Sequence, residues 1–482
     1  MIEFSSEKYD YSVEEVLAAA SSGRLLSAEI EFNRRCNYRC PYCYASGDYK
    51  DIVLESETAS SAIRQAAALG ARKIVVLGGE PLLYSELEEK IELITSLGMG
   101  AEIFTNAALM TPERAKFFFE HGCRVVVKLN SLKSEVQEKL TGVPGALDKA
   151  FNAINILKAA GYDRVPGMLV ASSVISSANE QEVVELWKYL RGNGVKPYLE
   201  IMTPQGRLLE NRDLEVKPAR LKEIFDEISS CDKALGYEWE PQPPLVGAKC
   251  LRHQYSCVIS ATGDIIPCVG LTVKIGNIYE KPLAEILSES VVLRKLRDFR
   301  NTIKGPCKSC EKADSCYGCR GAAYQLTGDY LASDPLCWKN SELLDAPYPF
   351  PCQAQDYIPH RPPMTMVKQL ESFGEYSIIS TQIAPDNRFL NDGVLDREVI
   401  PEIAAQACAV MTGFERSKTD MKGMLTGVRG MECQADIHSG DNLEILIRET
   451  GFIDNYHTVD FIIRKSDGTR CASGELSICE LD

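Results

Sequence analysis

The stretch that decides the fold reads Arg35-Cys36-Asn37-Tyr38-Arg39-Cys40-Pro41-Tyr42-Cys43-Tyr44. It follows a strand-like run at 28–33, so its three cysteines are expected on the loop after the first strand. The spacing C-x3-C-x2-C offers three thiolates, which can hold three irons of a [4Fe–4S] cube and leave the fourth open to a chelating ligand. Zinc would need four ligands, or three with a nearby histidine, and no histidine lies close. A zinc knuckle or free buried cysteines are the alternatives.

Strand-like and helical runs alternate after this loop. Apolar runs predict strands at 73–78, 100–106, 124–130, 167–175 and 196–202, with helical stretches between them. Several of these stretches end in glycine, a common helix stop. The alternation predicts a parallel sheet with right-handed crossovers. Six strands, each followed by a helix, favour a partial (β/α)6 TIM-like barrel within the α/β class, although periodicity alone does not separate it from a doubly wound sheet.

Length and charge narrow the functional classes. The chain has 482 residues, so the prior is about three domains. Its net charge of −15 repels phosphate backbones, which predicts no nucleic-acid partner. No apolar run reaches the length of about 18 residues that a membrane-spanning helix needs, so no membrane partner is expected. The acidic start has no apolar segment typical of a signal peptide, which predicts a cytoplasmic protein.

Cysteine is abundant and clustered. Of the 18 cysteines, three lie at 36–43 and eight between 250 and 337. Because the cytoplasm keeps thiols reduced, clustered cysteines indicate metal ligands rather than disulfides. Together with the alternating runs, this distribution predicts five segments: a lead-in at 1–26, the barrel at 27–235, a cysteine-rich module at 236–340, a proline-rich linker at 341–356, and a third α+β unit at 357–482.

Two motifs together resemble the radical S-adenosylmethionine (radical SAM) superfamily. The first is C-x3-C-x-aromatic-C with Tyr42 as the aromatic residue, and the second is Gly78-Gly79-Glu80-Pro81 after the second strand. The resemblance implies that the open iron binds S-adenosylmethionine, that the glycines let the backbone approach its amino-acid end, and that Glu80 accepts from its ammonium. It also implies that a reduced cluster cleaves the cofactor to a 5′-deoxyadenosyl radical, which removes a substrate hydrogen atom.

Polar residues at later strand ends are candidate cofactor contacts. Asn106, Asn130 and Ser172 lie at or near the ends of predicted strands, where barrel active sites gather. The family often places ribose ligands there, so the resemblance implies that role for these three; solvated strand ends are the alternative. Glu200 and Met202 on the sixth strand are weaker candidates.

The second cysteine group closely resembles the SPASM extension of radical SAM maturases. It reads C-x12-G-x4-C and then C-x2-C-x5-C-x2-C, with x2 where that pattern normally has x3. Eight thiolates satisfy two auxiliary [4Fe–4S] clusters, and two zinc sites are the alternative. The family's interleaved pattern implies the ligand sets Cys250, Cys257, Cys268, Cys319 and Cys307, Cys310, Cys316, Cys337. Val269 stands where sulfatase maturases have an aspartate base, which disfavours that reaction.

The C-terminal unit resembles the hotdog-fold acyl-carrier-protein dehydratases. The match rests on the PHRPPM start, a Glu-x-x-x-Gln helix and a closing GTRCASGEL strand. Glu402 matches the family's catalytic glutamate, and Gln406 lies near it. The loop at 389–393 lacks the family's histidine, and His360 belongs to a segment that the family uses structurally. Because dehydration needs a base, we expect dimerisation and acyl- or carrier-protein binding instead.

Three functions remain in competition. The first is a radical SAM/SPASM oxidoreductase or maturase acting on a peptide or protein, which is the commonest activity of the SPASM family. The second acts on a substrate tethered to an acyl carrier and bound with help of the hotdog domain. The third is a non-catalytic iron–sulfur electron carrier or scaffold. The enzymatic readings imply a flavodoxin- or ferredoxin-type electron donor and a homodimer formed through the hotdog domain.

Overall fold

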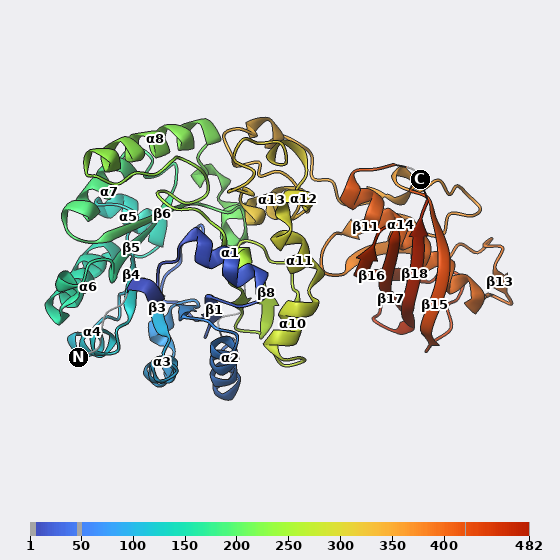
Figure 1. The fold of residues 1–482 in the computed structure, drawn as a ribbon, viewed down its shortest axis with the longest axis horizontal. Coiled ribbons are helices and arrows are strands. Elements are labelled where there is room, and N and C mark those ends of the chain that lie inside the picture. Colours follow the sequence, from blue (N-terminus) through green and yellow to red (C-terminus); the bar gives the residue numbers. More distant parts are fainter. Residues whose placement is uncertain (1–5, 46–50, 420, 482) are drawn as a thin grey trace. The chain divides into compact units, whose positions relative to one another are not determined.

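A computed structural model describes residues 6–45, 51–419 and 421–481 (Figure 1). The chain divides into two compact units. The first comprises the described residues up to 326 together with 330–346, and the second comprises 327–329 and the described residues from 347 onward. No helix among the described residues combines the length and apolarity that crossing a membrane requires.

Six parallel strands in sequential order form the first unit. Each strand pairs in parallel with the next along the chain. A doubly wound sheet would reverse its strand order part-way, so the predicted partial barrel is confirmed. The strands are β1 (Ser27–Glu31), β2 (Lys73–Leu77), β3 (Gly100–Thr105), β4 (Arg124–Lys128), β5 (Leu169–Ile175) and β6 (Lys196–Ile201).

Helices cover the outside of this sheet, as Figure 1 shows. α8 buries Leu221, Ile224, Phe225 and Ile228, an apolar face at helical spacing that packs in one core with Trp187 of α7. The helices that follow the loop after β1 are α2 (Ser56–Ala68), α3 (Leu87–Ser96), α4 (Pro112–Glu120), α5 (Ser134–Thr141), α6 (Ala146–Ala160), α7 (Val183–Gly192) and α8 (Pro218–Ala234).

The cysteine-rich module continues the same sheet. β7 (Val258–Ile259) pairs in parallel with β1, and β8 (Asp264–Ile266) and β9 (Gly276–Asn277) extend the sheet antiparallel. Four short helices follow, of which the first two bury leucine, isoleucine and valine side chains. They are α10 (Leu283–Glu289), α11 (Val291–Arg297), α12 (Phe299–Thr302) and α13 (Arg320–Thr327).

Ion pairs join β2, β3 and β4 to one another and to the lead-in. Lys73 Nζ lies 2.6 Å from Glu102, and the Arg124 guanidinium lies 3.3 Å from Glu102 and 2.7 Å from Asp10. Asp10 belongs to the lead-in, which continues into α1 (Val13–Ser21) through a capping box formed by Ser12 and Glu15. The lead-in is thus tied to the barrel by charge as well as by packing.

The second unit is an antiparallel sheet around one helix. Seven strands run in the order β10-β11-β12-β16-β17-β18-β15, and α14 (Ile400–Arg416) buries an apolar face that includes Ile403, Ala407 and Phe414. This confirms the predicted α+β unit. The strands are β10 (Cys352–Gln353), β11 (Gln369–Ser372), β12 (Ser377–Gln382), β15 (Gly423–Cys433), β16 (Asn442–Ile453), β17 (Tyr456–Lys465) and β18 (Arg470–Glu480).

Candidate functional site

The backbone of the glycine motif holds the loop that carries the first three cysteines. The Gly79 N–H donates to the Asn33 carbonyl and the Glu80 N–H to the Arg35 carbonyl, both at 2.7 Å. A Cβ on Gly79 would lie 2.2 Å from the Arg35 oxygen, and one on Gly78 would lie 2.5 Å from the Asn33 oxygen. The resemblance implied that these glycines let the backbone approach a cofactor. The structure adds a closer constraint, which is contact between the two loops.

We expect Gly79→Ala to displace the cysteine loop, because its Cβ has nowhere to go except into the Arg35 carbonyl. Chemical reconstitution followed by iron analysis should then show a loss of about four irons per chain, those of one cube. Gly192→Ala on α7 is the matched control, since its Cβ meets nothing within 4 Å. Full iron content in Gly79→Ala would contradict this account of the motif.

Glu80 is buried and is bonded mainly to its own scaffold. Its carboxylate accepts from the Leu82 N–H at 3.0 Å, from the Asn106 N–H at 2.8 Å and from the Thr105 hydroxyl. Burial raises the pKa of Glu80, which these hydrogen bonds only partly offset. A carboxylate offers about four acceptor positions, so one remains for a ligand such as an ammonium group. Pro81 is buried at the start of the short 3-10 helix that Glu80 caps.

Of the three polar residues predicted at strand ends, two line the pocket and the third holds a residue of the cysteine motif. Asn106 and Ser172 line the pocket beside the three cysteines. Asn130 stands behind it: its side-chain amide donates to the Tyr42 hydroxyl at 2.9 Å and accepts from the Val174 N–H at 3.1 Å. This geometry makes Asn130 a support for the aromatic residue of the cysteine motif, while its ribose contact stays a prediction.

One cavity of about 260 Å³ brings these residues together. It collects residues from the cysteine loop, the glycine motif and the ends of strands β3, β5 and β6, which the chain separates widely. Its walls include Cys36, Cys40, Tyr42, Cys43, Gly78, Gly79, Glu80, Asn106, Ser172, Glu200 and Met202. The weaker candidates Glu200 and Met202 therefore lie at the same site as the strong ones.

Lys128 is a pocket residue that was not predicted from the sequence. It ends β4 with its ammonium 5.3 Å from the centre of the Tyr42 ring, and burial lowers its pKa. The Glu200 carboxylate acts against this lowering. The sequence offered one weak signal for Lys128, its position directly after the apolar run Val125–Val127. The signal is weak because any polar residue can follow a buried strand where it reaches the surface.

The sulfur atoms are surrounded as iron–sulfur ligands require. Backbone N–H groups lie 3.4 Å from the sulfurs of Cys36, Cys316 and Cys319 and 3.3 Å from that of Cys268. Hydrogen bonds to sulfur tune and stabilise bound clusters. Among the described residues, no three His, Cys, Asp or Glu side chains converge as ligands of a single ion do; the ligands of a cube bind separate irons and need not converge.

The thiols hold their protons until a cation replaces them. Burial raises the pKa of Cys36 to about 11 and that of Cys40 to about 12. At neutral pH both are therefore thiols, and binding of iron must release their protons.

Electrostatic interactions between cysteines divide most of the later eight into two groups. Burial raises the pKa of Cys268 to about 12, with Cys250 as the next cause, and both are neighbours of Cys319. Cys337 has Cys307 and Cys316 among its charged neighbours, and Cys310 and Cys337 both act on Lys339. Cys257 has Glu29 and Arg297 as its charged neighbours. The two ligand sets stay a prediction for all eight cysteines.

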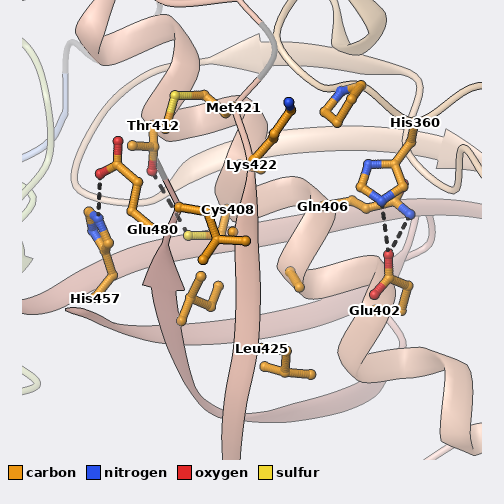
Figure 2. Close-up of a pocket in the computed structure, with 16 residues that line it drawn as sticks. His360, Glu402, Gln406, Cys408, Thr412, Met421, Lys422, Leu425, His457 and Glu480 are labelled. Atoms are coloured by element: carbon orange, nitrogen blue, oxygen red, sulfur yellow. Dashed lines mark hydrogen bonds and ion pairs between the residues drawn. The ribbon is translucent and has the colours of Figure 1, made fainter. Parts of the chain in front are cut away.

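The second unit has a pocket of its own, shown in Figure 2, of about 260 Å³. Glu402 of α14 lies in it, and its Oε1 accepts from Gln406 Nε2 at 2.7 Å and lies 3.5 Å from His360 Nε2. Glu402 was predicted as a site residue from the sequence, whereas His360 was assigned to a segment with a structural role. The structure brings the two together.

Models of three protein families match the chain. The radical SAM superfamily model matches residues 30–190, the iron–sulfur cluster-binding SPASM model matches 250–311, and the ApeP dehydratase model matches 352–482. The chain is a radical SAM enzyme with a SPASM domain and an ApeP-like domain. The first match contains the three cysteines and the glycine motif, and the second contains five of the eight later cysteines.

Curated relatives share the radical SAM and SPASM parts. An AdoMet-dependent heme synthase of Methanosarcina barkeri is 27% identical over 67% of this chain and 98% of its own length. A PqqA peptide cyclase of Streptomyces rochei is 26% identical over 64% of this chain and 88% of its own length. An AdoMet-dependent heme synthase of Nitratidesulfovibrio vulgaris is 24% identical over 64% of this chain and 90% of its own length. Proteins similar to this radical SAM enzyme therefore differ in what they act on.

Solved structures share the fold. Streptococcus suis SuiB bound to its precursor peptide SuiA has a TM-score of 0.53 and 16% identity, covering 67% of this chain and 79% of SuiB. The anSMEcpe protein with bound AdoMet has a TM-score of 0.53 and 19% identity, covering 67% of this chain and 96% of that protein. At these identities the likeness concerns the fold of the radical SAM and SPASM parts.

A larger cavity of about 560 Å³ adjoins the cluster pocket of the radical SAM enzyme. It runs along the barrel past Glu29, Tyr198 and Arg252 to Cys250 of the SPASM domain. Six residues line both cavities: Tyr44, Leu77, Phe104, Val126, Glu200 and Val269. The larger cavity therefore adjoins the pocket of the first three cysteines and is itself lined by Cys250, the first of the later cysteines.

Proposed function

We propose that this radical SAM enzyme starts radical chemistry on a peptide or protein substrate held in the larger barrel cavity. The observation that carries the proposal is that six residues line both that cavity and the cluster pocket, which puts a substrate in the larger cavity next to the space beside the three cysteines. Similar proteins named for peptide substrates, SuiB and the PqqA peptide cyclase, support a peptide.

The residues of the cluster pocket have separable tasks. Cys36, Cys40 and Cys43 would hold a [4Fe–4S] cluster, which when bound supplies the electron that splits S-adenosylmethionine into methionine and a 5′-deoxyadenosyl radical. Glu80 offers its remaining acceptor position to the ammonium of that cofactor. Asn130 fixes Tyr42 against the loop through their 2.9 Å hydrogen bond.

Two auxiliary clusters complete the proposed enzyme, one in each group of later cysteines. Iron and acid-labile sulfide should then reach about twelve of each per chain after anaerobic reconstitution, for three cubes. A flavodoxin- or ferredoxin-type protein is the proposed electron donor, since the reaction consumes an electron that the chain itself does not make.

The experiment that tests the function is reduction with dithionite in the presence of S-adenosylmethionine. Formation of 5′-deoxyadenosine is the expected result, and its absence from fully reconstituted protein would favour a non-catalytic electron carrier or scaffold. The neighbouring genes then indicate the class of substrate. A gene for a short precursor peptide would support a peptide substrate, and genes for a carrier protein with synthases would support a carrier-bound substrate.

That alternative is a substrate tethered to an acyl carrier. The specific observation in its favour is the match of residues 352–482 to the ApeP dehydratase model, because dehydratases of this kind act on carrier-bound acyl groups. Adding the candidate peptide and the candidate acyl carrier separately, and following consumption of each by mass spectrometry, decides between the two.

We also propose that two chains pair through β15. This strand ends the seven-stranded sheet and exposes Met424, Val428 and Met431 at 54%, 39% and 37%. An edge strand with exposed apolar side chains is a template for pairing with another chain. Val428→Lys should convert a dimer to a monomer in light scattering, whereas Ile453→Lys, also exposed, should not. A wild-type monomer would contradict the pairing.

A further inference from the structure

Arg320 is a buried cation of the cysteine-rich module for which the proposed function has not yet given a role. It begins α13 directly after Cys319 and is 1% exposed, which puts it among the largest fully buried side chains. Its Nη1 donates to the Ala332 carbonyl at 2.6 Å and to the Tyr330 carbonyl at 3.1 Å. These two hydrogen bonds fix the guanidinium against the segment that leads to Cys337.

The other two nitrogens of this guanidinium lack a partner. Both Nε and Nη2 are buried, and neither finds a hydrogen-bond acceptor within the described part of the chain. Native proteins rarely leave buried donors unsatisfied, and they bury a charge only beside groups that compensate it. Two unsatisfied donors on one buried cation therefore indicate that a negatively charged acceptor, which the polypeptide itself does not supply, lies beside them.

The neighbouring side chains do not supply this acceptor. Burial raises the pKa of Asp334 despite the nearby Arg320 charge, and the two Asp334 oxygens already accept from the Leu336 N–H at 2.9 Å and the Cys319 N–H at 2.8 Å. His253 is neutral at pH 7, because burial and then the charge of Arg320 lower its pKa to about 3. Neither side chain accepts from Nε or Nη2, so Arg320 has no hydrogen-bonded counter-ion among the described residues.

The unpartnered Nη2 lies beside the loop that carries Cys316. A Cβ built on Gly318 would lie 2.9 Å from Nη2, and the Gly318 nitrogen lies 3.4 Å from the Cys316 sulfur. Burial raises the pKa of Cys316, and Arg320 is the cation that acts against this rise. Cys316 belongs to the second of the predicted ligand sets. A cube held by four thiolates carries negative charge, which is the property that the two unsatisfied donors require.

We propose that Arg320 donates from Nε and Nη2 to the second auxiliary cluster and raises its reduction potential. The inference rests on the auxiliary clusters of the proposed function and is independent of the substrate. A buried cation that donates to a cluster favours the more negative, reduced form over the oxidised form. The couple transfers one electron: an external donor such as dithionite is oxidised, the cluster is reduced, and Arg320 keeps its protons.

A redox titration of the reconstituted full-length chain, followed by electron paramagnetic resonance, tests the inference. Cys40→Ala serves as the parent, because it removes the signal of the first cluster. At the parent's midpoint potential, Arg320→Met should lower the ratio of reduced to oxidised second cluster by about tenfold or more, the effect of losing one hydrogen bond to a charged group. Tenfold corresponds to a shift of 59 mV to lower potential for one electron. Arg320→Lys keeps the charge and should shift the potential less.

Two further variants identify the cluster and exclude a general effect of charge. Adding Cys310→Ala removes a predicted ligand of the second cluster, so Arg320→Met should then leave the remaining potential unchanged. Lys308→Met is the matched control, since it removes an exposed cation directly after Cys307 that water and salt screen. Its ratio of reduced to oxidised cluster should stay within about twofold of the parent's. Equal shifts in Lys308→Met and Arg320→Met, or no shift in Arg320→Met, would overturn the inference.

Iron analysis separates failure of this inference from failure of the proposed function. The Cys40→Ala parent should hold about eight irons, for two cubes, and a parent without the second cluster would overturn the proposed cluster count together with this inference. Loss of that cluster in both Arg320→Met and Arg320→Lys would assign Arg320 a structural role through its bonds to Ala332 and Tyr330, which would overturn the inference alone. Loss in Arg320→Met with a near-parent potential in Arg320→Lys would support it.

Discussion

A Cys40→Ala chain should form no 5′-deoxyadenosine above background when it is reduced with dithionite. Cys40 lines the cluster pocket with Cys36 and Cys43, and two thiolates cannot hold a cube that needs three. Iron should fall by about four per chain, while the later cysteines keep theirs. Liquid chromatography with mass spectrometry measures the nucleoside, and Cys231→Ala on α8, which belongs to neither cysteine group, is the control.

Cys310→Ala gives the complementary result. Cys310 belongs to the second auxiliary group, so cleavage of S-adenosylmethionine should continue while conversion of the substrate fails. Equal and total loss of the nucleoside in both variants would show that the auxiliary cysteines are needed for cleavage itself, and the proposed division between the two cysteine regions would be wrong.

Arg124→Leu should lower the free energy of unfolding of the barrel by about 3 kcal/mol, the lower end for breaking a buried ion pair, because it removes one of the two cations beside buried Glu102 and leaves only Lys73. The Arg124 side chain is 4% exposed, and Glu102, 3.3 Å away, is 11% exposed. All three tryptophans, Trp187, Trp239 and Trp338, lie in the first unit, so urea unfolding followed by tryptophan fluorescence reports on it alone. Arg164→Leu, at an 81% exposed side chain, should change stability by no more than about 0.5 kcal/mol.

The acid limb of the pH profile provides a second measurement on the same variant. Burial raises the pKa of Glu102, but Lys73 and Arg124 outweigh burial and bring it below its ordinary value. Its stabilising effect is therefore present above the unfolded-state pKa of about 4.3 and is lost as the pH falls below it. Arg124→Leu should flatten this loss, since Glu102 would keep only Lys73. An unchanged slope would mean that Arg124 does not stabilise the Glu102 carboxylate.

Much of the first unit follows from local patterns. The apolar runs at β2 and β4 and the glycine-terminated helices are set by residues close in sequence, so their order and type were predictable. The spacing of the first three cysteines is equally local, because all three lie within one loop of the chain. Joining of β7 to β1 was not predictable, since two short strands separated by the whole barrel carry no periodic signal.

In the cluster pocket, too, some residues were predictable from the sequence and others were not. Cys36, Cys40, Cys43 and the glycine motif could be named from the sequence because their identities are chemically restrictive. Lys128 and the hydrogen bond from Asn130 to Tyr42 were not predicted, because which side chain faces a cavity depends on strand register and on neighbours distant in the chain.

The spacing of cysteines and the period of apolar residues were enough to predict a loop of three cysteines followed by alternating strands and helices, since both are properties of short segments. The sequential strand order that distinguishes a partial barrel from a doubly wound sheet came from the tertiary structure. Tertiary structure alone decided that two cavities share a wall at Glu200 and Val269, and that His360 meets Glu402. Those contacts join segments whose separation along the chain has no bearing on their distance in space, and only packing of the whole unit sets it.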